Sequence, residues 1–214
     1  MKKPLLLIFF ILLADQVLKI WIKMNFTLGQ EYNLLGDWCR LHFIENEGMA
    51  FGMAFGGDVG KILLTVFRVV LSVFVFLYLV NIIRRKERKL VVYSFTLIFA
   101  GAVGNVIDSL FYGLVFSEST YFSVAEFLPS EGGYASFGLG KVVDMFYFPL
   151  IDTVLPQSWP VFGGMHIEFF NAIFNFSDAA ITIGLFMLIF SLFIKKNASD
   201  KELEKEIISD KICL

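Results

Sequence analysis

Two aspartates stand out because each interrupts an apolar stretch. Asp144 lies in VVDMF, and Asp178 lies in FNFSD at the start of a long apolar run. If the two carboxyl groups meet, they cannot easily both ionise, so one keeps its proton and the site holds one base and one acid. Such a pair suits hydrolysis of a peptide bond by an activated water. The pattern alone is equally compatible with each aspartate capping a helix or bonding to a loop.

Further polar residues occur at helical spacing within apolar segments. Asp15 and Lys19 are four residues apart in DQVLK, so they share a helix face and can pair, which lowers the cost of burying each charge. Asn105 and Asp108 are three apart in GAVGNVID and also share a face. The first pair fits a structural ion pair as well as a supporting role in an active site. The second pair fits hydrogen bonding between packed helices.

Glycines accompany two of these polar groups. Gly101 and Gly104 are spaced for close helix contact, and Gly48 follows Asn46 in NEGMAFG, where glycine permits a turn or a close backbone approach. Alternating residues before NEGMAFG indicate a short strand. His42 in that strand is interpreted as a surface residue, because no second histidine or cysteine lies at a metal-ligand spacing.

The composition is that of a membrane protein. The 214 residues are 57% hydrophobic and only 18% charged, with a formal net charge of −2. Soluble domains are typically about 45–50% apolar. No basic patch with interleaved aromatics is present, so nucleic acid is not an expected partner. No metal or other cofactor is expected either.

Four apolar segments are long enough to cross a bilayer core of about 30 Å, which takes about 20 helical residues. The predicted fold is an all-α membrane protein with four transmembrane helices and a small extracytoplasmic loop region that contains β-structure. The predicted spans are Leu5 to Ile22, Ile62 to Ile83, Leu90 to about Phe111, and Phe174 to Ile194.

The basic residues near the span ends predict the orientation. Lys2 and Lys3, the RRKERK segment at 84–89, and Lys195 with Lys196 all fall on one side of a four-span bundle. By the positive-inside rule both termini are cytoplasmic, and the loops at about 24–61 and 112–173 face outward. Residues 1–196 then form the membrane domain, and 197–214 form a charged cytoplasmic tail.

The motifs DQVLK, NEGMAFG, GAVGNVID, VVD and FNFSDAAIT, in this order on four spans, resemble the lipoprotein signal peptidases, the signal peptidase II family. Each motif is weakly specific alone, but the order and the topology are specific together. The resemblance implies an intramembrane aspartyl endopeptidase of the bacterial inner membrane. Its substrate would be a prolipoprotein in membrane lipid, cleaved before a cysteine that carries diacylglyceryl, and the inhibitor globomycin is expected to bind the catalytic pair.

The same resemblance implies residue roles. It assigns the catalytic dyad to Asp144 and Asp178, in preference to Asp152, which does not fit the family string. It assigns supporting or substrate-binding roles to a larger set of matching positions, namely Asp15, Lys19, Asn46, Gly48, Gly101, Gly104, Asn105, Asp108 and Asn175.

The chain departs from the family pattern in three respects. Ser109 stands where an arginine usually follows GNxxD, and Ser177 stands where an alanine usually precedes the last aspartate. Arg68, near the outer end of the second span, is a candidate for supplying the missing charge. The stretches on either side of VVD are also longer than usual.

The long second outer loop is a candidate lid over the site, and its glutamates Glu118, Glu126 and Glu131 are expected to be exposed. The region of Trp159, Phe162 and His166 and the residue Trp38 are expected to rest on the outer leaflet, because amphipathic rings favour the interface.

Two other function classes compete with a peptidase. A carrier or channel subunit would distribute its carboxylates through the membrane depth, whereas Asp108, Asp144 and Asp178 gather at one side. A metal-dependent lipid phosphotransferase would need several carboxylates on one helix face together with basic phosphate contacts. The outer loops contain few basic residues.

Overall fold

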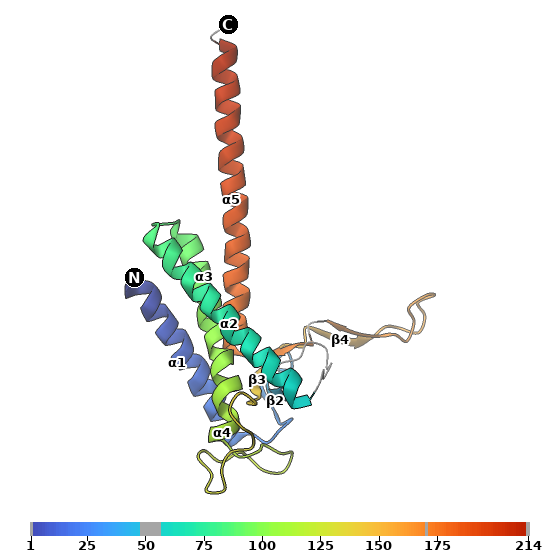
Figure 1. Ribbon diagram of the computed structural model, residues 1–214. Helices are drawn as coiled ribbons and strands as arrows, with labels where there is room; N and C mark the ends of the chain where they lie inside the picture. Colours follow the sequence, from blue (N-terminus) through green and yellow to red (C-terminus); the bar gives the residue numbers. More distant parts are fainter. Residues whose placement is uncertain (1, 48–56, 170, 213–214) are drawn as a thin grey trace.

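Four helices long and apolar enough to cross a membrane form the body of the protein, as the sequence predicts. The computed structural model describes residues 2–47, 57–169 and 171–212. The spans are α1 (Lys2–Asn25), α2 (Gly57–Arg84), a continuous helical stretch from Lys89 to Val115, and the first part of α5, Phe176–Ile194 (Figure 1). Helix α5 as a whole is Phe176–Ile212.

The spans carry their large apolar side chains outward and several polar side chains inward. Phe9 and Leu13 of α1 and Phe67 and Phe74 of α2 are about half exposed or more, so in a bilayer they face lipid. Asp15, Lys19, Asp108 and Asn175 are fully buried within the bundle or at its outer end. This distribution suits a membrane, where lipid provides no hydrogen bonds and polar groups must find partners inside the protein.

The third span changes helical geometry where its polar residues lie. It consists of α3 (Lys89–Ile107), a π-helical turn η2 (Asp108–Tyr112) and the short α4 (Gly113–Val115). A π-turn inserts an extra residue into the helix, and such turns occur frequently at functional sites. Here Asp108, Ser109 and Tyr112 are all buried.

Helix α3 packs closely on α5 because glycines line the contact. A Cβ atom on Gly101 would lie 2.2 Å from the Ser177 carbonyl oxygen, and one on Gly184 would lie 2.7 Å from the Ser94 carbonyl oxygen. At Gly104 a Cβ would lie 2.0 Å from Ser177 Oγ. These contacts bring the start of α5 against the polar end of α3.

A four-stranded antiparallel sheet lies at the end of the bundle where α1 ends and α2 and α5 begin, in the order β1-β2-β3-β6 (Figure 1). Its strands are β1 (Glu31–Leu35), β2 (Cys39–Asn46), β3 (Val142–Tyr147) and β6 (Ile173–Phe174). The strand expected before NEGMAFG is therefore present. Phe43, Val143 and Met145 from this sheet pack with Ile22 of α1 and with Phe116, which directly follows α4, in one buried cluster.

The register of the sheet places Asn46 next to Asp144. Ile44 pairs with Asp144 and Asn46 pairs with Val142. Residues two apart on a strand share a face, so Asn46 and Asp144 are diagonal neighbours on the same face. Strand β6 continues the sheet on the other side of β3 and leads directly into α5.

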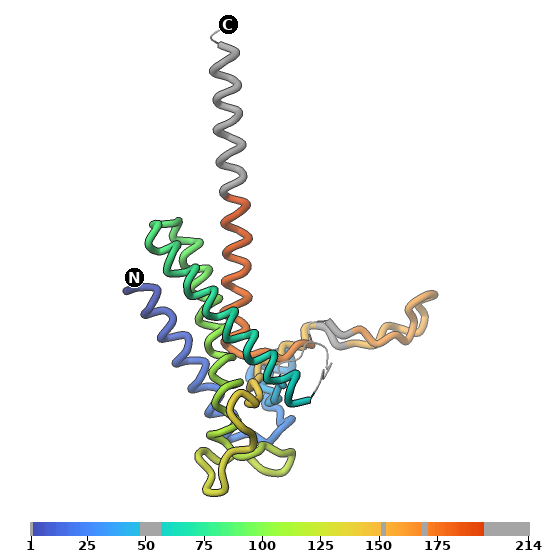
Figure 2. The backbone as a smooth tube through the Cα atoms, viewed as in Figure 1, coloured from blue at the N-terminus to red at the C-terminus, as the bar shows by residue number. Residues whose placement is uncertain are grey.

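The connection between β3 and β6 contains a second, separate hairpin. Strands β4 (Ile151–Val154) and β5 (His166–Phe169) pair only with each other. This hairpin, residues 151–169, is called the arm below, and it projects sideways from the body of the protein (Figures 1 and 2). Asp152 lies on the arm.

We expect Gly101→Ala to destabilise the bundle by about 1–3 kcal/mol, the typical cost of overpacking a well-packed core. The added methyl group would meet backbone atoms of Ser177, which cannot rotate away. Thermal unfolding in detergent micelles measures the effect. Val66→Ile, which adds one carbon to a lipid-facing position of α2, is the matched control. An unchanged unfolding temperature for Gly101→Ala would contradict the close helix contact.

Candidate active site

Asp144 lies in the middle of β3 and receives hydrogen bonds from two amides. Asn175 Nδ2 donates to Asp144 Oδ1 at 2.6 Å, and Asn46 Nδ2 donates to Asp144 Oδ2 at 3.1 Å. The side chain is almost completely buried. Burial, together with the nearby charge of Asp178, raises the pKa of Asp144 to about 7, although the two amide hydrogen bonds and Lys19 act in the opposite direction.

Asp178 lies in the first turn of α5 and completes a capping box with Asn175. The Asp178 backbone N–H donates to Asn175 Oδ1 at 2.9 Å, and the Asn175 backbone N–H donates to Asp178 Oδ2 at 3.3 Å. This reciprocal pattern satisfies two backbone donors at a helix start. The other carboxyl oxygen, Oδ1, accepts from Asn105 Nδ2 at 2.7 Å. Helix capping and a place in the site are therefore combined in one residue.

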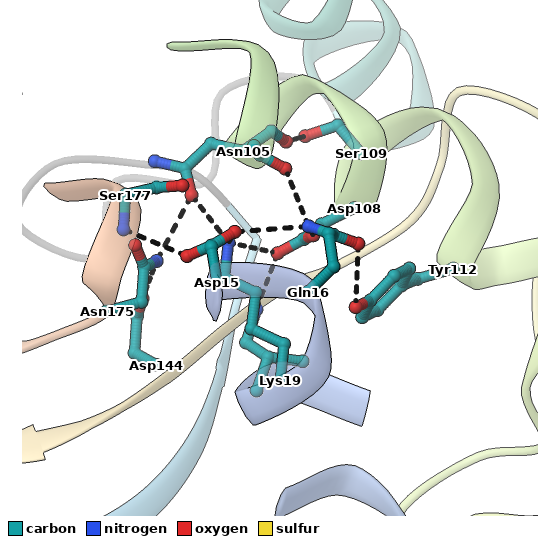
Figure 3. Close-up of polar contacts among 12 residues, drawn as sticks. Asp15, Gln16, Lys19, Asn105, Asp108, Ser109, Tyr112, Asp144, Asn175 and Ser177 are labelled. Atoms are coloured by element: carbon teal, nitrogen blue, oxygen red, sulfur yellow. Dashed lines mark hydrogen bonds and ion pairs between the residues drawn. The ribbon is translucent and has the colours of Figure 1, made fainter. Parts of the chain in front are cut away.

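Asn175 connects the two aspartates. It bonds Asp144 through its side chain and Asp178 through its backbone N–H, and its Nδ2 also donates to Asn105 Oδ1 at 3.1 Å. It is completely buried. Figure 3 shows Asn175 and Asp144 side by side, with Asn105 reaching toward them from α3. The structure thus brings together residues from β3, α3 and the start of α5.

A buried ion network supports this group from the side of α1. Lys19 Nζ lies 3.0 Å from Asp15 Oδ2 and 2.8 Å from Asp108 Oδ2, and it donates to Asn105 Oδ1 at 2.9 Å. All three charged side chains have no exposed surface. Asn105 therefore lies between Lys19 and Asp178, so the ammonium group orients the amide that bonds the second aspartate. Figure 3 shows the Lys19 and Asn105 side chains of this link.

The two carboxylates of this network hold other elements in place. Asp15 Oδ1 accepts from the backbone N–H of Ser177 at 2.9 Å, which ties α1 to the first turn of α5. Asp108 Oδ2 accepts from the backbone N–H of Val143 at 3.3 Å, which ties the π-turn to β3. Because the contact to Asp15 uses the backbone of Ser177, a serine in place of the usual alanine keeps it.

Sequence reasoning missed Gln16 and Tyr112 as members of the network. Gln16 Nε2 donates to Asp108 Oδ1 at 3.0 Å, and Tyr112 OH donates to Gln16 Oε1 at 3.1 Å. The available signals were an amide next to Asp15 within an apolar span, and a tyrosine four residues after Asp108 on the same helix face. Both signals are weak because neither residue type is unusual near a membrane interface.

Arg68 contacts Ser109, the residue that stands where family members usually have an arginine. Its Nη1 donates to Ser109 Oγ at 2.9 Å. The guanidinium group is attracted by the charges of Asp178, Asp108 and Asp144. Arg68 thus enters the site from α2, as expected from its depth in the span, and its contact is with Ser109 itself.

A second buried charge cluster, also missed from sequence, lies beside the site. Lys23 Nζ pairs with Glu45 and donates to Ser119 Oγ at 2.8 Å, and Lys141 Nζ lies 3.5 Å from Glu45 Oε2. Lys23 and Lys141 both lie over the ring of Tyr134. Glu45 directly precedes Asn46, so this cluster fixes the end of β2 that presents Asn46 to Asp144.

The remaining predicted positions fall into three groups. Gly101 and Gly104 lie at the contact of α3 with α5, while Gly48 lies outside the described residues. His42 is a half-buried residue of β2, and its Nδ1 lies 3.0 Å from Glu31 Oε1. The outer-loop glutamates are exposed, namely Glu118, Glu126 and Glu131.

Comparisons with known proteins agree with the family resemblance. The family model for signal peptidase (SPase) II matches residues 7–194. A lipoprotein signal peptidase of Porphyromonas gingivalis is 45% identical over 184 residues, which is 86% of this chain and 79% of the relative. One of Amoebophilus asiaticus is 34% identical over 178 residues, which is 82% of this chain and 71% of the relative.

A solved structure shares the fold. It is described as a bacterial membrane enzyme, is 21% identical, and superposes with a TM-score of 0.60 over 94% of this chain and 92% of its own. Because the family model spans most of the sequence and a close relative aligns over a similar length, the chain belongs to the signal peptidase II family.

Proposed function

We propose that Asp144 and Asp178 are the catalytic dyad with which this chain cleaves prolipoproteins. Members of its family remove the signal peptide of prolipoproteins, and the chain is an aspartic-type peptidase of a bacterial membrane. The observation that supports the dyad is the link through Asn175, which bonds both carboxylates at the outer end of the bundle. Asp152, the other candidate, lies on the arm.

In the proposed reaction the dyad holds one proton. The ionised carboxylate takes a proton from a water molecule as the water oxygen attacks the scissile carbonyl carbon, and the protonated carboxyl donates its proton to the carbonyl oxygen. Collapse of the tetrahedral intermediate breaks the C–N bond, and the proton taken from water goes to the leaving amine. One hydroxyl of the intermediate returns its proton to the carboxylate that had acted as the acid, so the carbonyl of the product acid forms and the dyad again holds one proton. The raised pKa of Asp144 favours this residue as the carrier of the shared proton at neutral pH.

Within the described part of the chain, the side chains that bond directly to the two aspartates are neutral amides rather than cations. Asn46, Asn105 and Asn175 donate to the carboxylates, and none of them neutralises a negative charge. A cation bonded directly to the dyad would favour ionisation of both carboxylates and remove the acid. Lys19 instead pairs with Asp15 and Asp108 and reaches the dyad only through Asn105.

We propose further that the substrate is a diacylglyceryl-modified prolipoprotein, cleaved just before the lipidated cysteine. Its acyl chains would remain in lipid while its peptide bond reaches the dyad at the outer end of the spans. The basic clusters at Lys2–Lys3 and at 84–89 support cytoplasmic termini and a site on the outer side of the inner membrane. Globomycin is expected to compete for the same place.

The dyad predicts that Asp144→Asn and Asp178→Asn each abolish cleavage without unfolding the bundle. Loss of acid–base catalysis typically costs about 10²–10⁴-fold in rate. The measurement is cleavage of a diacylglyceryl prolipoprotein by purified protein in micelles, with globomycin as the inhibited reference. Glu126→Gln, at an exposed carboxylate of the outer loop, is the matched control and retains full activity. Normal turnover by either aspartate variant would remove that residue from the dyad.

The raised pKa of Asp144 predicts that cleavage declines as the pH rises through about 7. Above that value Asp144 loses the proton that the dyad needs, so the rate falls on the alkaline side. A rate that stays constant well above this value would contradict the assignment of the proton to Asp144. The pH dependence of the single-turnover rate in micelles measures the effect.

Stability provides a check that does not depend on turnover. The pKa of Asp144 is higher in the folded protein than the unfolded value of about 4. The contribution of this carboxyl to stability is therefore largest at acid pH and is lost as the pH rises through about 7. Asp144→Asn should unfold at a higher temperature than the wild type at alkaline pH, and the difference should shrink on acidification.

Arg68 is proposed to supply the positive charge that family members provide from the position of Ser109. We expect Arg68→Ser to lower the cleavage rate by about 10–100-fold, since a hydrogen bond to a charged group contributes about 1.5–3 kcal/mol. The double variant Arg68→Ser with Ser109→Arg should recover much of the rate. The two side chains are in contact, so an arginine at position 109 can place its guanidinium group close to where that of Arg68 lies. Ser109→Arg alone, which places two guanidinium groups next to each other, should not raise the cleavage rate above that of the wild type. An Arg68→Ser variant with full activity and stability would exclude the role.

A further inference from the structure

The tip of the arm displays an uncharged, apolar surface. Residues 153–165, TVLPQSWPVFGGM, contain no charged side chain. Five of its large apolar side chains are more than half exposed, and Val161 reaches 78%; the five are Val154, Trp159, Val161, Phe162 and Met165. The charged or titratable residues of the arm lie in its paired strands, at Asp152, His166 and Glu168. The arm is therefore polar near its base and apolar at its tip.

The tip has a defined conformation held by its own backbone. The Leu155 N–H donates to the Met165 carbonyl at 2.9 Å, and the Gly163 N–H donates to the Trp159 carbonyl at 3.1 Å. A Cβ atom on Gly163 would lie 2.6 Å from the Gln157 carbonyl oxygen, and Gly164 has a φ of +76°. Both positions therefore favour glycine, and the turn they form holds the apolar side chains on its outside.

The arm lies at membrane level. It leaves the body between β3 and β6, and β6 leads directly into the membrane-spanning part of α5. Figure 1 shows the arm running sideways from the start of α5, at the height of the outward half of α2 and not beyond its end. Large apolar side chains in the first half of α2, such as Leu63 and Phe67, are more than half exposed, so in a bilayer they face lipid. The surroundings of the arm at this height are therefore the outer leaflet of the same bilayer.

We propose that the arm inserts its tip into the outer leaflet of the membrane, with residues 154–165 in contact with lipid acyl chains. An exposed surface of this kind is costly in water, whereas lipid accepts it without any complementary protein surface. Trp159 provides the amphipathic ring that favours the boundary between headgroups and chains. The charged strands at the base remain with the headgroups and water.

Insertion of the arm into lipid would also set the depth of the site relative to the membrane surface. The arm joins β3, which carries Asp144, to the turn that carries Asn175 and Asp178. A lipid-anchored arm therefore ties both dyad-bearing segments to the membrane surface. The insertion of the arm tip into lipid is argued only from the exposure of its side chains and from the position of the arm. The consequence for cleavage rests on the proposed dyad.

The test uses Trp159 as a depth reporter in the full-length chain. The chain contains three tryptophans, so Trp21→Phe with Trp38→Phe leaves Trp159 alone. This protein is placed in lipid nanodiscs at one copy per disc, made from phosphatidylcholine that is either unlabelled or brominated on its acyl chains. A protein that retains only Trp21, which is exposed on the membrane-spanning helix α1, serves as the reference for a lipid-facing ring.

We expect brominated chains to quench Trp159 about as strongly as Trp21, and we expect aqueous acrylamide to quench it weakly. The variant Val161→Asp with Phe162→Asp in the same background should shift Trp159 toward acrylamide quenching, while the unfolding temperature of the bundle stays unchanged. The proposal would be overturned if brominated acyl chains left the Trp159 fluorescence unchanged while aqueous acrylamide quenched it. With one copy of the protein per disc, a second copy cannot be what shields the arm tip from water. Cleavage activity is not read out, so the result does not depend on the proposed dyad.

Discussion

The buried contact of Lys19 with Asp15 and Asp108 holds the rest of the structure in position. One ammonium group lies within 3.0 Å of both carboxylates, and none of the three side chains is exposed. Removing one partner from such a group leaves an uncompensated buried charge, which is strongly destabilising. Asp15 also bonds the start of α5, and Asp108 bonds β3. A single ionic contact therefore joins every element that carries a residue of the proposed dyad.

The dyad is separated from this ion network by amides. Asn105 accepts from Lys19 and donates to Asp178, so it transmits orientation without bringing the ammonium into direct contact with the carboxylate. Asp144 accepts hydrogen bonds from the side-chain amides of Asn46 and Asn175 and keeps a raised pKa. The arrangement keeps cations near enough to position the site and far enough to leave one carboxyl protonated.

The region of strands and loops adds features that the spans alone do not provide. The cluster of Lys23, Glu45 and Lys141 holds the end of β2 that lies beside Asp144, and the arm extends sideways from the segment between β3 and β6. The 45% identical relative and the solved membrane enzyme both align over most of this chain.

The sequence by itself determined the four spans, the strand before NEGMAFG and the family, because apolar length, alternation and motif order are local properties of the chain. It also indicated Arg68 by its depth. Only the tertiary structure decided that Asn175 links Asp144 to Asp178, that Gln16 and Tyr112 join the network, and that Lys23 pairs with Glu45. Except for the Asn175–Asp178 contact within the first turn of α5, these contacts join residues far apart in sequence. They depend on the π-turn at Asp108, the glycine contact of α3 with α5 and the register of β2 on β3, none of which periodicity reveals.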